Sequence, residues 1–501
     1  LVILIFWLSL FNFLRASSVI NSLWTFLLGF LSASAQSKKI KIVDSLSLDP
    51  VSFATVFFSN NNGVISNELG FFELVPEQYK IQDTLFVSSM GYETKRIPIT
   101  TFNDTIIRLN PETITLKNVV VTNKELSSIE IIEKVKQNIE LNYNSGINEN
   151  KLFFRQDYNQ ISEEFTLNKF KSSIKDLNAK VMDSILENLP KESRSELESL
   201  SYYYVNDELD TPKIKLIKSR RTNDDNASDL SKSLGKKLES SLKENLKSSS
   251  YFKIRSGWLP FSFDLTINGL WDIDSTDQEQ LDKLKNEEVK RKENFSNFQK
   301  GRIQNVYFKS FTNSNSDLNF ILESKRYQFS NPELSYLGND LVYVINCLPL
   351  RSDKFKATLY INSEDFAIVR LDYENVKPLS KFKLLGISLL EYLEKGRMRF
   401  SKLNNEKYDL SYFQSTKENK ASINRPFKII EKNKVVKGRN KQNQISGKLN
   451  LSIKSKYNIE LQVFKTRVIN SKEFDDLDEK NQVLPEYLEE FTTNFWEEFD
   501  E

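Results

Sequence analysis

Short runs of β-branched and aromatic residues alternate with polar residues from Lys38 to Thr122. Turn-forming residues separate the runs, as at Leu48-Asp49-Pro50. Short strands with turns at this spacing are typical of a β-sandwich. We therefore predict a first folded domain over residues 36–122, built as a β-sandwich.

Four segments of this domain resemble, in order, the carboxypeptidase-like regulatory domain, a transthyretin-like sandwich common in secreted and outer-membrane proteins of Bacteroidota. They are DPVSFATVFF, GVISNELGFFEL, FVSSMGYE and LNPETITLKNVVVT. The resemblance implies that the second segment forms a hairpin. It also implies a structural role without catalysis, because zinc carboxypeptidases need histidine ligands and this chain contains no histidine.

The stretch NNNGVISNELGFF, residues 60–72, is interpreted as a structural turn, with a ligand-binding loop as the alternative. Gly63 is expected to supply a positive φ, and Asn67 to bond its own backbone. Gly70 would return the chain to the sheet, and Phe72 would point into the core. The spacing does not match a calcium loop. The motif residues of the resembled family are Gly63, Asn67, Gly70, Phe72, Gly91 and Tyr92.

A helix is predicted after the sandwich. Ser127 and Glu130 have the spacing of a capping box, and Gly146 is a stop signal. Apolar residues recur every four positions between these signals, which gives one helical face. They are Ile131, Val135, Ile139 and Tyr143.

Two further polar helices are predicted, over 165–200 and 226–248. In the second, every fourth residue from Leu230 to Leu246 is leucine. This stripe would pack onto the protein's own body or onto a partner helix. With a linking strand at KLFFRQDY, these helices define a helix-rich segment over 123–250.

From residue 251 the pattern returns to strands, so we predict an antiparallel β body over 251–470. The hairpin KATLYINSEDFAIVRLDYE, with its turn at Asn362–Asp365, resembles the strand pairs of lipoprotein-carrier-like half-barrels, in which a curved antiparallel sheet wraps an apolar cavity. An acidic C-terminal helix is predicted over 471–501, with Pro485 near a first turn. The expected fold class is multidomain α+β. The other strands of the body are expected in YFKIRSGWLPFSFDL, GRIQNVYFKSF, DLNFILESKRYQF, DLVYVINCLPL and the ranges 397–415, 426–437 and 447–469.

Residues 1–35 have the pattern of a secretory signal peptide. Arg15 precedes an apolar core at Leu23–Leu31, and Ala33-Ser34-Ala35 has the spacing of a cleavage site. Leu1–Leu14 is a second apolar run, which is either translated upstream sequence or an uncleaved anchor. We therefore expect an extracytoplasmic protein, in the periplasm or at the outer membrane or cell surface.

Composition restricts the chemistry. Lysine plus arginine (70) balances aspartate plus glutamate (68), which gives no general attraction to nucleic acid. The absence of histidine excludes the usual general base. Cys347 lies in an apolar context and is expected to be a buried thiol. Carboxylate pairs such as Glu163-Glu164 lie in polar runs and are expected on the surface. We predict no catalytic residue, metal or cofactor.

We interpret the chain as a non-enzymatic, secreted or envelope-associated binding or assembly protein. Its expected partners are an envelope protein, a lipid or a glycan, with association at the outer membrane. The alternatives are a protein associated with an outer-membrane β-barrel or formed as one, a lipid carrier and a hydrolase. Charges on both faces, such as Lys354, Lys356 and Arg370, disfavour a barrel. The inside of the curved sheet would be filled by the polar helices or by a lipid.

Overall fold

The computed structural model separates the chain into two compact units. The sandwich unit contains described residues 38–111 and 333–343, and the body unit contains described residues 126–332 and 344–488. Between residues 38 and 488 the structure describes all positions except 52–53, 59–62, 67–69, 75–79, 81, 90–91, 93–94, 112–125, 144–145, 176, 189, 207–210, 224–239, 241–243, 247–249, 257–258, 261–277, 338–339, 352, 404, 434–441 and 480–481.

The sandwich unit contains the two predicted sheets. One has the order β4-β1-β7 and the other the order β3-β2-β5-β6. Residues from both sheets, including Ile40, Val56, Phe72 and Leu85, form one core cluster. The bounds are β1 Lys38–Asp44, β2 Thr55–Phe58, β3 Gly63–Ile65, β4 Phe71–Leu74, β5 Thr84–Ser88, β6 Lys95–Pro98, the 3-10 turn η2 Ile99–Thr101 and β7 Ile106–Leu109.

The segment GVISNELGFFEL crosses from one sheet to the other, so the expectation of a hairpin there is wrong. β3 pairs with β2, whereas β4 pairs with β1. Ser66, between the two strands, is fully buried. Its hydroxyl accepts a hydrogen bond from the Ala54 N–H at 2.8 Å, which satisfies a buried backbone donor at the crossing.

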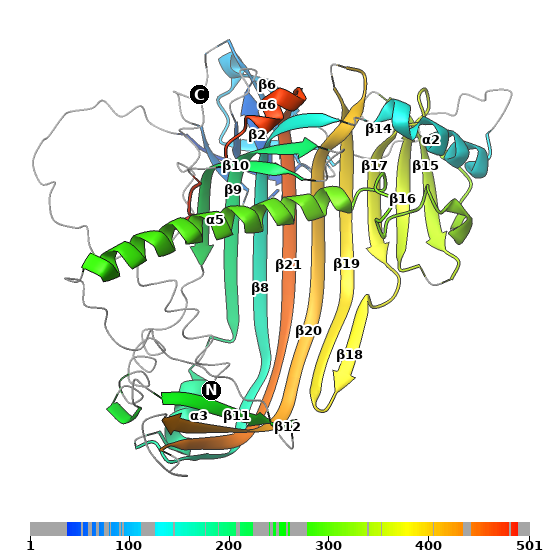
Figure 1. The fold of residues 1–501 in the computed structure, drawn as a ribbon. Coiled ribbons are helices and arrows are strands. Elements are labelled where there is room, and N and C mark those ends of the chain that lie inside the picture. The colour runs from blue at the N-terminus through cyan, green and yellow to red at the C-terminus, as the bar shows by residue number, and fades with distance from the viewer. Residues whose placement is uncertain are drawn as a thin grey trace, which may run out of the picture. The chain divides into compact units, whose positions relative to one another are not determined.

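The body unit is built on a large sheet whose central strands are unusually long (Figure 1). Its main path has the order β13-β15-β16-β17-β19-β20-β21-β8-β9-β10-β22. β13 pairs antiparallel with β15, and the strands from β16 to β10 along this path pair antiparallel in turn, whereas β10 and β22 pair in parallel. The bounds are β8 Ile147–Ser172, β9 Glu192–Asn206, β10 Lys213–Asn223, β11 Ser250–Ser256, β12 Leu259–Pro260, β13 Tyr327–Phe329, β14 Glu333–Leu337, β15 Asp340–Pro349, β16 Phe355–Asn362, β17 Ile368–Asn375, β18 Ser380–Leu384, β19 Ile387–Lys402, β20 Tyr408–Asn433, β21 Gln444–Val468 and β22 Glu486–Leu488. Of these, β14 and residues 340–343 of β15 belong to the sandwich unit.

Few helices accompany this sheet. They are α2 Ser128–Asn142, α3 Ala179–Glu187, α5 Gln278–Phe308 and α6 Ser471–Asp475, with a 3-10 turn, η4, at Ser324–Arg326. The capping box of α2 is confirmed, because Ser127 accepts from the Glu130 N–H and the Glu130 carboxylate accepts from the Ser127 N–H. After α2, the Tyr143 hydroxyl donates to the Ile368 carbonyl at 2.9 Å, which ties the helix to β17.

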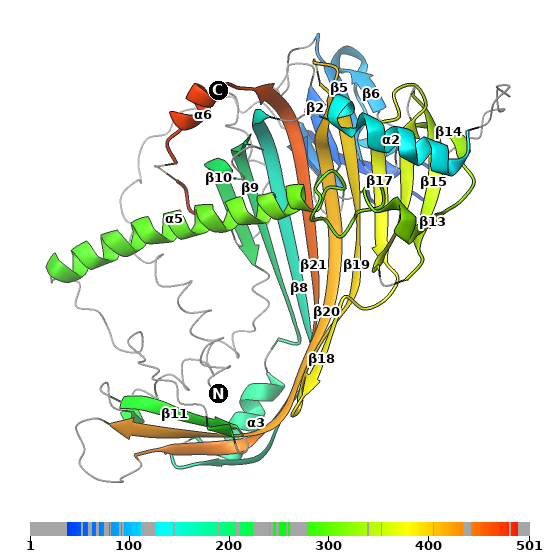
Figure 2. The ribbon, with the colours of Figure 1, turned by 45° about the vertical axis from the view of Figure 1, so that its right-hand side comes forward.

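Helix α5 lies against one face of the sheet, and the long strands bend toward that same side (Figure 2). Tyr307 of α5 stacks on Tyr203 of β9 with ring centroids 5.5 Å apart. Ile303 and Val306, which also belong to α5, are buried. We call the face that carries α5 the inner face, and the opposite one the outer face.

Two predicted elements, one helix and one strand, are wrong. Of the helix expected over 165–200, only α3 is helical, and the rest lies in β8 and β9. β9 buries polar residues such as Glu198 and Ser199, which bond to partners on β8, and this polar composition made a buried strand resemble an exposed helix. Residues 301–308, expected as a strand, continue α5, because Ile303 and Val306 bury one helical face.

The remaining expectations have mixed outcomes. The hairpin around Asn362–Asp365 is confirmed as β16 and β17, and Cys347 is buried on β15. Residues 486–488 form β22 and not the expected C-terminal helix, because they pair with the exposed edge of β10. Residues 1–35, most of 226–248 and residues 489–501 lie outside the described residues.

Candidate functional site

The register of the body sheet arranges side chains in rows that cross several strands. Residues paired directly across antiparallel strands point to the same face of the sheet. A row of opposed residues can therefore be followed from strand to strand. Two features of these rows stand out. One row is made mostly of charged residues, and two neighbouring rows are made mostly of apolar residues.

The ionic row crosses seven strands of the outer face, from β17 to β10. Each member is paired with the next in the register. Acidic and basic residues alternate along most of it, which places opposite charges beside each other. The row is Asp372, Arg397, Gln414, Glu460, Arg155, Glu198 and Arg220.

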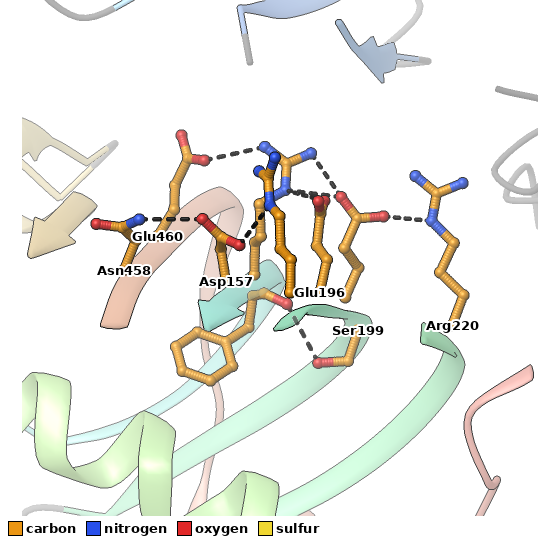
Figure 3. A network of polar contacts seen from close by, with 10 residues as sticks. Asp157, Glu196, Ser199, Arg220, Asn458 and Glu460 are labelled. Carbon is orange, nitrogen blue, oxygen red and sulfur yellow. Dashed lines mark hydrogen bonds and ion pairs between the residues drawn. The ribbon is translucent and has the colours of Figure 1, made fainter. Parts of the chain in front are cut away.

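Arg155 lies between Glu460 and Glu198 in this row. Figure 3 shows the surrounding network, with Glu460, Glu196 and Arg220. Arg155 Nη2 lies 2.5 Å from Glu198 Oε1, and its Nη1 lies 3.2 Å from Glu460 Oε2. Glu198 also forms a close ion pair with Arg220, and both side chains are 1% exposed. In the adjacent row, Asp157 accepts from Arg194 on β9 and from Asn458 on β21.

The carboxylates of this network differ in pKa because their surroundings differ. Burial raises the pKa of Glu198, but the charges of Arg155 and Arg220 outweigh burial and hold that pKa below its usual range. The pKa of Glu196 is raised to about 7, mainly by burial. The charge of Arg155 opposes this rise, and the charges of Glu198 and Asp157 favour it. Burial raises the pKa of Glu460 as well. Glu196 and Glu460 are therefore the members of the network in which burial favours the protonated form.

This network is suited to fixing strand register, since each buried charge has an opposed partner. Among the residues that the structure describes, no cluster of acidic, histidine or cysteine side chains has the arrangement of a metal site. We assign the network a structural role.

The apolar rows lie on the inner face, where the long strands extend past α5. One row pairs Leu384, Ile387, Ile423, Leu451 and Phe165 across β18, β19, β20, β21 and β8. The next row pairs Phe382, Leu389, Ala421, Ile453 and Ser162. Five strands thus present a continuous apolar surface on one face.

The β18–β19 end of this surface is open to solvent. Leu384 is 56% exposed, Phe382 48% and Ile387 41%, whereas Leu451 on β21 is buried. A contiguous exposed apolar surface on a folded protein marks a binding site for an apolar group. Further along the same strands the apolar face closes into a core cluster around α3, with Ile429, Ile445 and Met182.

Of the sequence-predicted motif residues, Gly70 and Phe72 have the expected roles. Gly70 has φ +75°, and Phe72 is fully buried in the sandwich core. Gly63 begins β3 opposite Phe57, so the expectation that it lies in a turn is wrong. Asn67 and Gly91 lie outside the described residues.

Tyr92 links two parts of the sandwich unit. Its hydroxyl donates to Asp44 Oδ2 at 2.9 Å, and its backbone forms an isolated bridge with Pro111. Burial raises the pKa of Tyr92 to about 12, with the hydrogen bond to Asp44 contributing. These contacts are structural and bring no reactive group into the motif.

Neither set of rows was found from the sequence. The alternation in FKLLGISLL, residues 382–390, is the one local signal for the apolar rows. The ionic row joins residues from distant segments, so it becomes visible only with the strand register.

Comparison with known proteins identifies the sandwich. Residues 41–121 match the family described as the CarboxypepD_reg-like domain, so the chain contains a carboxypeptidase-regulatory-like domain. No curated protein matches the chain.

Two solved structures show distant similarity. A domain assigned as an outer membrane lipoprotein-sorting protein from Vibrio parahaemolyticus is 9% identical, with 69% of this chain and 95% of that chain covered and a TM-score of 0.20. A membrane-associated protein of unknown function from Bacteroides fragilis is also 9% identical, with 86% and 98% covered and a TM-score of 0.13. Similarity at this level carries no weight for function.

Proposed function

We propose that the protein is a non-enzymatic, envelope-associated binding protein whose body unit holds the acyl chain of a lipid on its inner face. The observation that carries this proposal is the pair of apolar rows across β18, β19, β20, β21 and β8. Its extracytoplasmic placement is supported by the apolar run and Ala33-Ser34-Ala35 pattern before residue 36.

The size of the surface suits a single chain. Strands lie about 4.8 Å apart, so a row across five strands spans about 19 Å. One leaflet of a bilayer has about half of the ~30 Å hydrocarbon thickness, which is the reach of one acyl chain. Each methylene that leaves water contributes about 0.8 kcal/mol, so covering part of one chain offsets the cost of association.

The part of the chain that the structure describes contains no helix with the length and apolar character to cross a bilayer. We propose that the protein associates with the envelope through bound lipid or a partner.

Native mass spectrometry of protein purified without detergent tests the proposal. We expect copurifying lipid on the wild-type protein and loss of that lipid in Leu384→Asp, because an aspartate in the open end of the row places a charge against the acyl chain. Leu350→Asp is the matched control, because Leu350 is 55% exposed, almost the same as Leu384, but lies outside the rows.

A wild-type protein that carries no lipid and does not bind an added apolar dye would contradict the proposal. That result would favour an adaptor or assembly module. Equal loss of lipid in both variants would place the binding surface elsewhere.

A further inference from the structure

Helix α5 places an arginine over the inner face, on strands β8 and β21, which carry the apolar rows further along. The Arg302 guanidinium lies 4.1 Å from the centroid of the Phe298 ring and 5.1 Å from that of Tyr457 on β21. Its Nη1 also donates a close hydrogen bond to the Gln156 side chain on β8. Arg302 is thus positioned by three contacts, none of which neutralises its charge.

A second arginine lies in the same row of the sheet. Arg221 on β10 pairs with Leu197 on β9, and Leu197 pairs with Gln156. Arg221 therefore points to the inner face, two strands from the residue that Arg302 contacts. Its Nε is buried and has no hydrogen-bond acceptor within the described part of the chain.

Two other cations near these arginines are paired with carboxylates. Lys300 on α5 pairs with Glu479 at 2.9 Å, and Lys309 pairs with Glu394 at 2.9 Å. For Arg221 and Arg302 the described residues supply no carboxylate partner. Burial, and after it the charge of Arg221, together lower the pKa of Arg302 to about 10, as expected for a buried cation beside a like charge.

Two neighbouring guanidinium groups without a carboxylate are suited to a shared anion. Guanidinium binds phosphate and carboxylate through parallel hydrogen bonds and is less strongly hydrated than an ammonium group. The Tyr457 ring beside Arg302 leads along β21 to Ser455, Ile453 and Leu451 on the same face. At about 3.3 Å per residue, Ile453 lies about 13 Å from Tyr457 and Leu451 about 20 Å from it.

We propose that Arg221 and Arg302 bind the anionic head group, a phosphate or a carboxylate, of the lipid whose acyl chain covers the apolar rows. This inference rests on the proposed function and adds the chemical class of the ligand, an anionic amphiphile. Uncharged lipids of the same chain length would bind through the rows alone.

Three probes with the same chain separate the contributions: dodecyl phosphate, dodecanoic acid and dodecanol, measured by displacement of an apolar dye from the full chain. We expect wild-type protein to bind the two anions at least about 10-fold more tightly than the alcohol, because hydrogen bonds to charged groups are strong when water is excluded. Arg302→Gln and Arg221→Gln should each remove most of that preference and leave dodecanol binding unchanged.

Arg291→Gln is the matched control, because Arg291 is an exposed arginine on the same helix. Arg291→Gln should leave the affinities for the two anions and for dodecanol unchanged. Arg302→Lys should keep part of the preference, since it keeps the charge and loses the planar fork. Thermal melting confirms that each variant is folded.

Equal affinity for dodecanol and the anions, or a preference that survives both glutamine variants, would overturn the head-group site while the proposed function stands. If inorganic phosphate binds at these arginines and the dodecyl chain adds no affinity, the site takes a free anion and the lipid proposal fails there. If none of the three probes binds, the proposed function itself fails.

Discussion

At the scale of single residues, backbone conformation decides the role of Gly70. Its φ of +75° is in the left-handed region, and a Cβ built there would lie 2.4 Å from the Ile42 carbonyl oxygen. We expect Gly70→Ala to lower the free energy of unfolding of the sandwich unit by about 1–3 kcal/mol. Calorimetry of the full chain would measure this.

The contrasting glycine is Gly301 in α5, where an added Cβ would meet no atom within 4 Å. Gly301→Ala should stabilise the body unit by up to about 1 kcal/mol, because alanine favours the helix.

A Gly70→Ala variant with an unchanged melting temperature but lost partner binding would show that the 60–72 stretch is a recognition loop.

Also at the residue scale, Glu196 gives the body unit a pH dependence. Its pKa is raised from about 4.5 to about 7, mainly by burial, so between these values the folded state holds a proton that the unfolded state releases. The free energy of unfolding should therefore fall as pH rises from about 4.5 to 7.

We expect Glu196→Gln to remove most of this fall and to raise the free energy of unfolding at pH 8 by about 1–3 kcal/mol. Denaturant unfolding across pH 5–8 tests it. Glu163→Gln is the control, because Glu163 is on the surface and its pKa is lowered, mainly by the hydrogen bond to Lys420. An unchanged pH profile in Glu196→Gln would contradict this assignment.

At the scale of elements, the ionic row should hold the register of β21, β8, β9 and β10. Arg155→Gln would leave Glu198 and Glu460 buried with a lost partner, so we expect a loss of about 3–5 kcal/mol in the free energy of unfolding. Arg467→Gln is the control, because Arg467 likewise contacts carboxylates, Glu149 and Glu473, but is 50% exposed.

Arg467→Gln should lower the free energy of unfolding by about 0–1 kcal/mol, the value typical of exposed ion pairs. Similar losses in the two variants, measured by denaturant unfolding, would show that the buried row contributes no more than a surface pair.

Also at this scale, the sequence was sufficient where each strand carries its own local signal. The alternation around Asn362–Asp365 predicted β16 and β17, and Ser127 with Glu130 predicted the start of α2. It was insufficient for β9, whose polar residues are buried by partners that are distant in sequence. The apolar rows could not be predicted either, because a β-bulge at Glu163 changes which residues of β8 face inward.

At the scale of the whole molecule, the chain joins a carboxypeptidase-regulatory-like domain to a body with an open apolar face. The described residues bring no catalytic constellation to that face, and the arginines at its margin are suited to an anion. We therefore expect a bound acyl chain to lie on this open apolar face.

Photocrosslinking tests this claim most directly. The full chain is incubated with a fatty acid that carries a diazirine near its methyl end, irradiated, digested and mapped by mass spectrometry. We predict crosslinks in residues 382–389 of β18 and β19 and near Ile423 and Ile453, and their loss in Leu384→Asp but not in Leu350→Asp. Crosslinks confined to the sandwich unit, or an identical pattern in both variants, would contradict the account.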